Sequence, residues 1–179
     1  MAILPILIHP DPRLKKTCEP VTAFDESLRG FCDDMLSTMY DAPGIGLAAP
    51  QVGDLRRIFV MDCTGKEEEP QPMVIINPEI TWASEEENTH QEGCLSIPDQ
   101  FDDVTRPAEI DLRFFDANGE LHERRFDGLW ATCAQHEIDH LNGTLFIDHI
   151  SRMKRSMITR KMQKLKRDLA RSPASTAQV

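Results

Sequence analysis

The sequence of 179 residues lacks any hydrophobic run long enough to span a membrane. A transmembrane helix needs about 20 consecutive, mostly apolar residues, and no segment approaches that length. Residues 1–8 are apolar, but they lack the basic start and the small-residue cleavage site of a signal peptide. We read them as a first strand or extended segment, and we expect a cytoplasmic protein that has no membrane partner.

Three further patterns are missing. The five cysteines are odd in number and irregularly spaced, which argues against a disulfide framework and fits a reducing compartment. No internal repeat and no linker interrupts the chain. Residues 1–171 are therefore expected to form a single domain, and residues 172–179 are expected to be a disordered tail.

Charge is distributed unevenly along the chain. The net charge is −10, yet residues 151–171 hold nine basic side chains and one acidic one. Apolar residues recur in this segment at near-helical spacing: Met153, Met157, Ile158, Met162, Leu165 and Leu169. The pattern predicts a basic amphipathic helix. Either its apolar stripe packs on the domain with the charges in solvent, or its charges contact RNA.

The main chemical motif is His136-Glu137-Ile138-Asp139-His140. In a helix, His136 and His140 lie one turn apart on the same face and can chelate one divalent metal. Glu137 can reach a water bound to that metal without being a ligand. The motif indicates metal-assisted hydrolysis of an acyl bond.

The surroundings of the motif predict a buried helix. Asp127 is suited to cap its start, and Asn142-Gly143 is suited to end it. Apolar residues are spread around most of its circumference: Leu129, Trp130, Cys133, Ile138 and Leu141. Because a helix that is apolar nearly all round is buried, its two histidines need partners there. A metal explains them more simply than histidines satisfied within the core do.

Two residues compete to be the third ligand. His149 lies downstream, but its spacing from His140 does not match the longer signature of metalloproteases. Cys94 lies upstream in Glu92-Gly93-Cys94-Leu95-Ser96, a short segment ended by Pro98. A thiolate and two imidazoles leave one coordination position open, as in catalytic sites, whereas Cys94 alone would read as a small buried hydrophobe.

A third segment is Gly44-Ile45-Gly46-Leu47-Ala48-Ala49-Pro50-Gln51. Its small residues allow a close backbone approach, although a tight loop packed on a sheet explains them as well. It is not a dinucleotide fingerprint, because the third glycine is missing and no strand precedes it. The amide of Gln51 is able to donate to a developing oxyanion.

These three segments, in this order, closely resemble the motifs of the peptide deformylases, and the resemblance covers roughly residues 3–170. It implies removal of the N-terminal formyl group from methionine of newly made polypeptides. It implies Fe(II) as the native metal, with zinc, nickel or cobalt able to substitute. The implied partners are N-formylmethionyl nascent peptides and, through the 151–171 helix, the ribosome near its exit tunnel, with no DNA partner.

The resemblance also implies a role for individual residues. Cys94, His136 and His140 would bind the metal, and Glu137 would act as general base and then as general acid. Gln51 and the backbone N–H of Leu95 would stabilise the oxyanion. Glu92 would hold the motif through a hydrogen bond outside the ligand shell. Asp139 either does the same or is a solvated carboxylate.

The resemblance places the methionine side chain in an apolar slot. Ile45, Gly46, Leu129 and Cys133 would line it, although ordinary core packing explains the apolar ones equally well. The chain departs from many bacterial members at Phe101, where a basic residue or tyrosine is usual. That departure concerns contacts to the peptide beyond methionine.

The remaining segments predict an α+β fold, with small antiparallel sheets around a central metal-binding helix and the amphipathic helix at the C-terminus. A helix capped by Asp25 should end before Pro43-Gly44. Strands are predicted at 57–63 and 73–78, and a hairpin at 109–126 turns at 116–119.

Two other functions fit the same sequence. One is a hydrolase that has this site but acts on a larger acyl-amide, which would need more room around the reacting carbon. The other is a structural or RNA-binding module, which would need a closed site with four ligands. Gln51 and Glu137 have no evident structural use in such a module.

Overall fold

The computed structural model describes residues 1–172. The helices of this part are α1 (Glu26–Asp41), α2 (Gly128–Leu141) and α3 (Arg152–Arg171), with short 3-10 turns η1 (Pro12–Lys15), η2 (Ala49–Val52) and η3 (Phe146–His149). The strands are β1 (Gly46–Ala48), β2 (Ile58–Met61), β3 (Met73–Ala83), β4 (Glu87–Cys94), β5 (Ile97–Pro107), β6 (Glu109–Phe115) and β7 (Leu121–Asp127). Of the predicted tail, only Ser172 belongs to the described residues.

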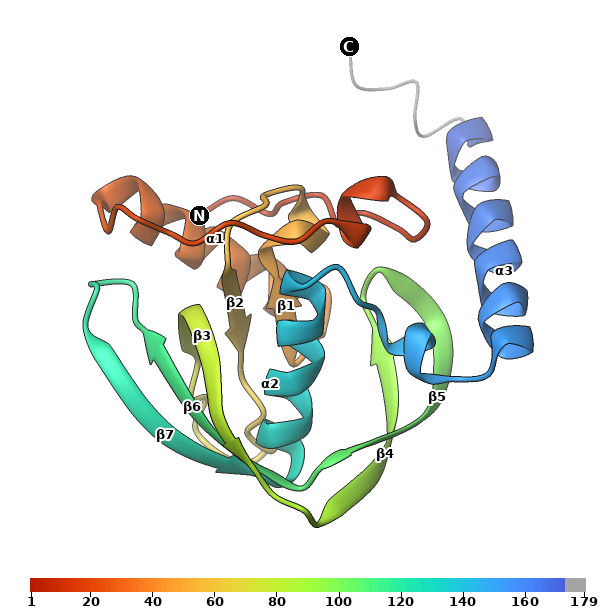
Figure 1. Ribbon diagram of the computed structural model, residues 1–179. Helices are drawn as coiled ribbons and strands as arrows, with labels where there is room; N and C mark the ends of the chain where they lie inside the picture. The colour runs from red at the N-terminus through yellow and green to blue at the C-terminus, as the bar shows by residue number, and fades with distance from the viewer. Residues whose placement is uncertain (173–179) are drawn as a thin grey trace.

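The strands form two antiparallel sheets. Five strands pair in the order β1-β2-β3-β6-β7, and β4 pairs only with β5. Helix α2 lies between the two sheets, and Figure 1 shows it upright with β4 and β5 on one side and the larger sheet on the other. The expected α+β fold with antiparallel sheets around a central helix is confirmed.

Helix α2 ends as predicted but is less buried at its start. Asn142 is its C-cap, and Gly143 follows with a φ of 75°, a conformation that favours glycine. Asp127 occupies the N-cap position, although its side chain makes no capping hydrogen bond. Residues 131–138 are all buried, but Leu129 is 45% exposed. The prediction of a buried helix was therefore wrong at Leu129, which lies at the rim of a cavity.

Helix α1 follows its predicted pattern. The Asp25 side chain accepts a hydrogen bond from the Leu28 N–H at 2.9 Å, which satisfies one free donor of the first turn. Leu28, Met35 and Met39 are fully buried against β2. The helix ends at Asp41, before Pro43.

Two strand predictions need correction. The predicted strand at 73–78 continues through Pro78 to Ala83 as β3, and a shift in pairing register between Ile76 and Glu79 accommodates the proline, which has no N–H to donate. The segment of Cys94 does not end at Pro98. It is one arm of a long hairpin whose second strand, β5, runs from Ile97 to Pro107. The hairpin predicted at 109–126 is confirmed as β6 and β7.

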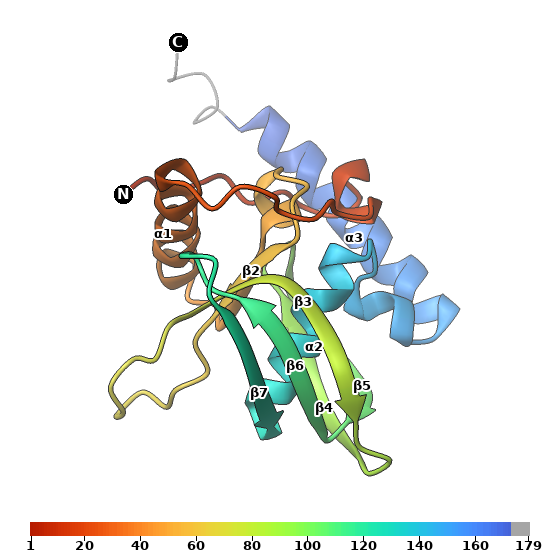
Figure 2. The same cartoon turned by 60° about the vertical axis from the view of Figure 1, so that its left-hand side comes forward.

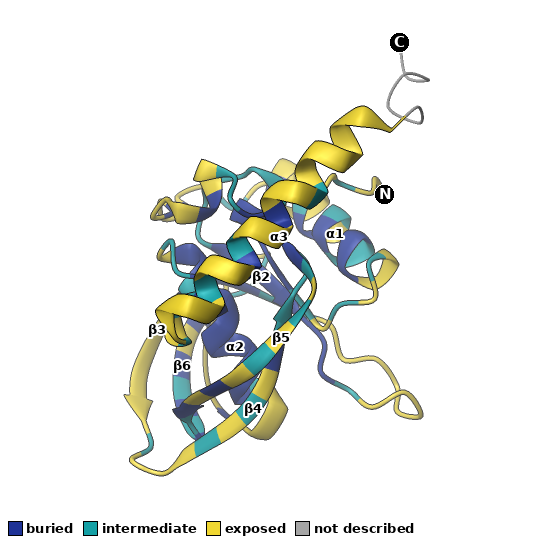
Figure 3. Ribbon diagram, turned by 90° about the vertical axis from the view of Figure 1, so that its right-hand side faces the viewer, coloured by how far each residue is buried: buried dark blue, intermediate teal, exposed yellow. Residues whose placement is uncertain are grey.

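Helix α3 forms over the predicted segment, but only part of its predicted apolar stripe is buried, since Met153, Met157 and Leu169 are exposed. Ile158 and Met162 are buried, and they pack in a cluster with residues of η1, β5 and η3. Most other residues of α3 are exposed, and Figure 3 shows the helix as a largely exposed rod across one face. No helix in residues 1–172 is both long and apolar enough to span a membrane.

Candidate metal centre and active site

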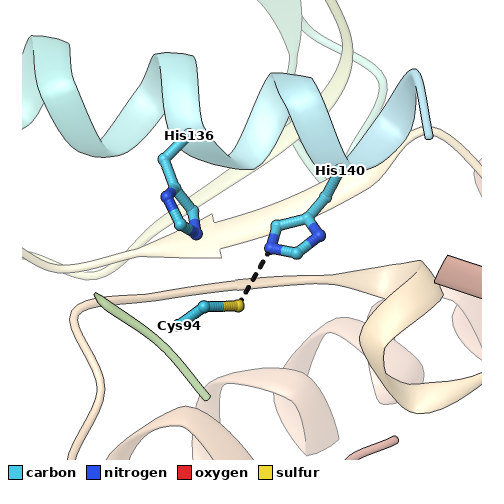
Figure 4. Close-up of side chains that lie close together, drawn as sticks. All are labelled: Cys94, His136 and His140. Carbon is cyan, nitrogen blue, oxygen red and sulfur yellow. Dashed lines mark hydrogen bonds between the residues drawn. The ribbon is translucent and has the colours of Figure 1, made fainter. Parts of the chain in front are cut away.

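Three donor atoms meet where α2 faces the end of β4. His136 and His140 stand one turn apart on α2, with their ring centroids 5.0 Å apart. Cys94, the last residue of β4, brings its Sγ to 3.3 Å from Nε2 of His140. Figure 4 shows the three side chains converging, and one ligand atom from each lies within 4.8 Å of the others. One thiolate and two imidazoles are suitable ligands for a divalent transition metal.

His149, the competing third ligand, lies outside this group. Its Nε2 pairs instead with Asp139 Oδ2 at 2.8 Å. Within residues 1–172, no fourth histidine, cysteine or carboxylate joins the three donors. The group is therefore the open three-ligand arrangement typical of catalytic sites, not the closed arrangement that a structural module would need.

Glu92 determines which nitrogen of His136 faces the cluster. Its Oε1 lies 2.9 Å from His136 Nδ1. Burial raises the pKa of Glu92, but hydrogen bonds from Arg106 and His136 outweigh it and lower the pKa to about 2. An ionised carboxylate can only accept, so Nδ1 of His136 carries the hydrogen and Nε2 is left for the metal.

Arg106, which the sequence analysis missed, holds the carboxylates behind the histidines. Its Nε and Nη2 donate to the two oxygens of Glu92 at 2.7 and 2.9 Å. Its Nη1 donates to Asp139 Oδ2 at 2.8 Å, so the Asp139 side chain, which is 23% exposed, is bound to the same arginine and is not a freely solvated carboxylate. Arg106 takes an inward position of β5, two residues after the buried Val104. An arginine at such a position indicates a buried ion pair, but the strand itself was not predicted.

Replacing Arg106 by methionine should destabilise the protein strongly. The Arg106 and Glu92 side chains are 7% and 5% exposed, and removing one partner of a buried pair leaves an uncompensated charge, at a cost of about 3–5 kcal/mol. Urea unfolding would measure the loss. Arg113→Met, which removes an exposed partner of Glu123, is the control and should change stability little. Equal losses in both variants would contradict the role of the buried pair.

The pKa values of the two histidines shift in opposite directions. Burial, His136 and Arg106 lower the pKa of His140 well below its usual value, so this ring is neutral, as a metal ligand must be. Burial also lowers the pKa of His136, but hydrogen bonds with Cys94 and Glu92 outweigh it and raise the pKa overall. A divalent cation among these donors competes with that proton.

Glu137 lies beside the cluster without being part of it. The residue is 4% exposed, and its Oε2 is buried without a hydrogen-bond partner among the described residues. An unpartnered carboxylate oxygen is costly and fits a water molecule or substrate held next to it. Burial, partly opposed by His136, raises the pKa of Glu137 to about 7.

Gly46 gives Glu137 its space. A Cβ atom at Gly46 would stand 2.5 Å from Glu137 Oε1 and 2.8 Å from Cys133 Sγ. Both contacts are shorter than those that real Cβ atoms make, so the side chains of Glu137 and Cys133 would both have to move. Strand β1 can approach α2 this closely only with glycine at this position.

Gly46→Ala should therefore lower kcat/KM by about 100-fold, since a displacement of about 1 Å in a reacting group can cost that much. Gly30→Ala is the matched control, because a Cβ there meets nothing within 4 Å and alanine favours a helix interior. Initial rates of both variants, with metal content, test the prediction. Full activity of Gly46→Ala would mean that Glu137 does not need its present position.

The Gln51 side chain has a fixed orientation. Its Oε1 accepts from the Ala48 N–H at 2.9 Å, which turns Nε2 toward the cluster. Nε2 donates to Ser96 Oγ at 3.1 Å and to Cys94 Sγ at 3.4 Å. Ser96 had no assigned role in the sequence analysis, but its hydroxyl helps to hold the amide at the metal centre.

A cavity of about 600 Å³ opens beside the cluster. The predicted site residues along its wall are Ile45, Gly46, Gln51, Glu92, Cys94, Leu95, Leu129, Cys133, His136 and Glu137. Ile45 and Leu129 are 43% and 45% exposed, whereas Cys133 is 5% exposed. The apolar side of the cavity thus runs from an exposed rim to a buried end.

Phe101 stands at the rim, 61% exposed. A Cβ at Gly93 would come within 2.5 Å of the Phe101 ring, so the ring lies directly on the backbone of β4 beside the cavity. Phe101 replaces the basic residue or tyrosine that is usual in many bacterial members, and this difference therefore lies at the rim of the cavity and not at the metal centre.

Known proteins resemble this chain over most of its length. The polypeptide deformylase family model matches residues 3–156. The peptide deformylase of Mesorhizobium japonicum is 52% identical over 170 residues, covering 95% of this chain and 97% of that protein. That of Rhodopseudomonas palustris is 51% identical, covering 99% and 100%.

Solved structures agree in fold. A peptide deformylase from Legionella pneumophila superposes with a TM-score of 0.88 at 48% identity, covering 96% of this chain and all of that one. The enzyme from Ehrlichia chaffeensis in complex with actinonin gives a TM-score of 0.88 at 43% identity, covering 93% and 99%. With the family model, the full-length relatives and these structures in agreement, the chain belongs to the peptide deformylase family.

Proposed function

We propose that this protein is a metallohydrolase that removes the N-terminal formyl group from methionine of newly synthesised polypeptides and releases formate. The observation that carries the proposal is the open Cys94, His136 and His140 donor set, with buried Glu137 beside it, in a chain of the deformylase family. We further propose that residues 1–171 act as one catalytic domain and work in the cytoplasm, where nascent chains are made.

Cys94, His136 and His140 would hold the metal. A divalent metal bound there would lower the pKa of a water molecule and polarise the carbonyl group whose carbon is attacked. Family resemblance favours Fe(II) as the native ion, and the same donors accept zinc, nickel or cobalt. Glu92 and Arg106 would keep His136 in its ligating tautomer.

Glu137 would move the proton. Its free Oε2 is suited to take a proton from the water that attacks the formyl carbon and then to deliver it to the departing amine. Gln51 Nε2 and the Leu95 N–H would donate to the developing oxyanion, where one such donor is worth about 3–4 kcal/mol. The hydrogen bond from the Ala48 N–H to Gln51 Oε1 supports this role, because it turns Nε2 toward the metal centre.

The methionine side chain would enter the apolar end of the cavity. Ile45, Leu129 and Cys133 offer it apolar contacts, and Gly46 leaves room beside Glu137. The formyl group would then lie at the metal centre.

Formate release from formyl-Met-Ala-Ser tests the proposal directly. Protein purified without oxygen should release formate at a rate proportional to its metal content. Acetyl-Met-Ala-Ser is the control and should not be cleaved. Release of acetate instead of formate would replace the proposal with a hydrolase of larger acyl groups, and no release by folded, metal-loaded protein would overturn it.

Cys94→Ser tests the ligand set. A hydroxyl is a poorer donor for soft metals than a thiolate, so the variant should lose affinity for zinc more than for harder manganese. Competition with a chromogenic chelator measures both affinities. Unchanged affinity for zinc would remove Cys94 from the ligand set.

Contact with the ribosome near its exit tunnel is the proposed role of α3. Support comes from exposed basic residues toward its C-terminal end, Lys164, Arg167 and Arg171. Exchanging these three for glutamine should reduce co-sedimentation with ribosomes severalfold and leave hydrolysis of a short formyl peptide unchanged. Unchanged sedimentation would leave α3 as a packing element with solvated charges.

A further inference from the structure

A second groove lies between α3 and the N-terminal segment, apart from the metal-site cavity. Its volume is about 530 Å³, and it shares no lining residue with the metal-site cavity. Figures 1 and 2 both show η1 beside α3. The groove is lined by His9, Lys15, Ile147, Asp148, Arg155, Ser156, Thr159, Arg160 and Gln163.

Cations outnumber acids in this groove. Lys15, Arg155 and Arg160 line it with one carboxylate, Asp148. Asp148 pairs with Lys15 at 2.7 Å and with Arg155 at 3.6 Å, and it also accepts the Leu145 N–H at 2.8 Å. Arg160 forms no ion pair with any residue in 1–172. The groove therefore presents one free guanidinium and a net charge of +2.

His9, on the wall of the groove, experiences this positive potential. It is 6% exposed, and its Nε2 lies 2.9 Å from Thr159 Oγ1 of α3. Burial lowers its pKa, and Lys15 and Lys166 lower the pKa further, against the opposing effect of Asp148. Neutral donors complete the wall, because the Ser156 hydroxyl and the Gln163 amide also line it.

We propose that this groove is a binding site for a phosphate group, carried either by a small phosphate compound or by the backbone of a polynucleotide. An arginine fork matches two phosphate oxygens, and lysine adds a point charge. Hydroxyl and amide hydrogens can satisfy the remaining oxygens. The site is distinct from the hydrolytic one, because the two cavities share no lining residue.

Arg160 should dominate the affinity, since it is the cation without an internal partner. Arg160→Gln should weaken binding by about tenfold, the value of one charge-assisted contact. Lys161→Gln is the matched control, because this neighbour loses the same charge, is exposed and does not line the groove. Both side chains are on the surface of α3, so the fold of either variant should be retained.

Titration calorimetry with pyrophosphate and anisotropy with a labelled single-stranded RNA decamer, both at low salt, distinguish the two sources. Saturable binding of pyrophosphate that Arg160→Gln weakens and Lys161→Gln does not would support a small phosphate compound. Binding of the RNA alone, with the same difference between variants, would support a polynucleotide. Equal effects of the two substitutions, or no binding of either probe, would overturn the proposal.

Discussion

Replacing Glu137 by glutamine should lower kcat/KM for a formyl-methionyl peptide by about 10²–10⁴-fold, the usual contribution of a general acid–base. Glutamine has the same shape but cannot take up the proton. Because Glu137 is not among the three donors, the variant should bind as much metal as the wild type. Formate release and metal analysis on one preparation test both parts.

The control for this variant is Glu67→Gln, which removes one carboxylate from the exposed turn between β2 and β3. Its rate should equal that of the wild type. Wild-type turnover by Glu137→Gln would remove the proposed base. Loss of metal together with turnover would instead place Glu137 among the ligands.

Replacing His140 by alanine should abolish both metal binding and activity. Two protein ligands, Cys94 and His136, would remain, too few to hold the ion in the three-ligand site that catalysis needs. Metal binding also stabilises the folded protein by mass action, so Tm should no longer rise when metal is added. Metal analysis and thermal unfolding with and without added metal measure these effects.

His122→Ala controls for histidine removal at another cluster. His122 lies with Asp116 and Glu120 in an exposed group whose donor atoms are also close together. This variant should keep one metal per chain and full activity. A second metal in the wild type that disappears in His122→Ala would show that the exposed group also binds metal. Activity surviving in a metal-free His140→Ala variant would contradict a metal-dependent reaction.

Local patterns in the sequence were sufficient to predict the two histidine ligands. A spacing of four residues places His136 and His140 on one helix face whatever surrounds the helix, and the structure has them one turn apart. The start of α1 and the end of α2 could also be predicted from nearby residues, because Asp25 and Gly143 each act within a single helical turn. The hairpin of β6 and β7 was predicted from its turn residues for the same reason.

Long-range pairing determined what the sequence left open. Whether Cys94 or His149 joins the histidines depends on the β4–β5 hairpin, which delivers residue 94 to α2 and was not predicted. Pro98 suggested that the segment ends there. In a two-stranded sheet, however, each strand has one unpaired edge, and proline is tolerated at such an edge. The degree of burial at Leu129 likewise depended on the cavity beside it.

The sequence by itself indicated metal-assisted hydrolysis through His136, Glu137 and His140 on one helix, because these residues lie within a few positions of one another. Only the tertiary structure decided how the groups are held. Arg106 reaches Glu92 and Asp139 from another strand, Gln51 donates to Cys94 and Ser96, and Gly46 makes room for Glu137. Such contacts join residues far apart in the chain, so they follow from how the two sheets pack around α2 and not from local spacing.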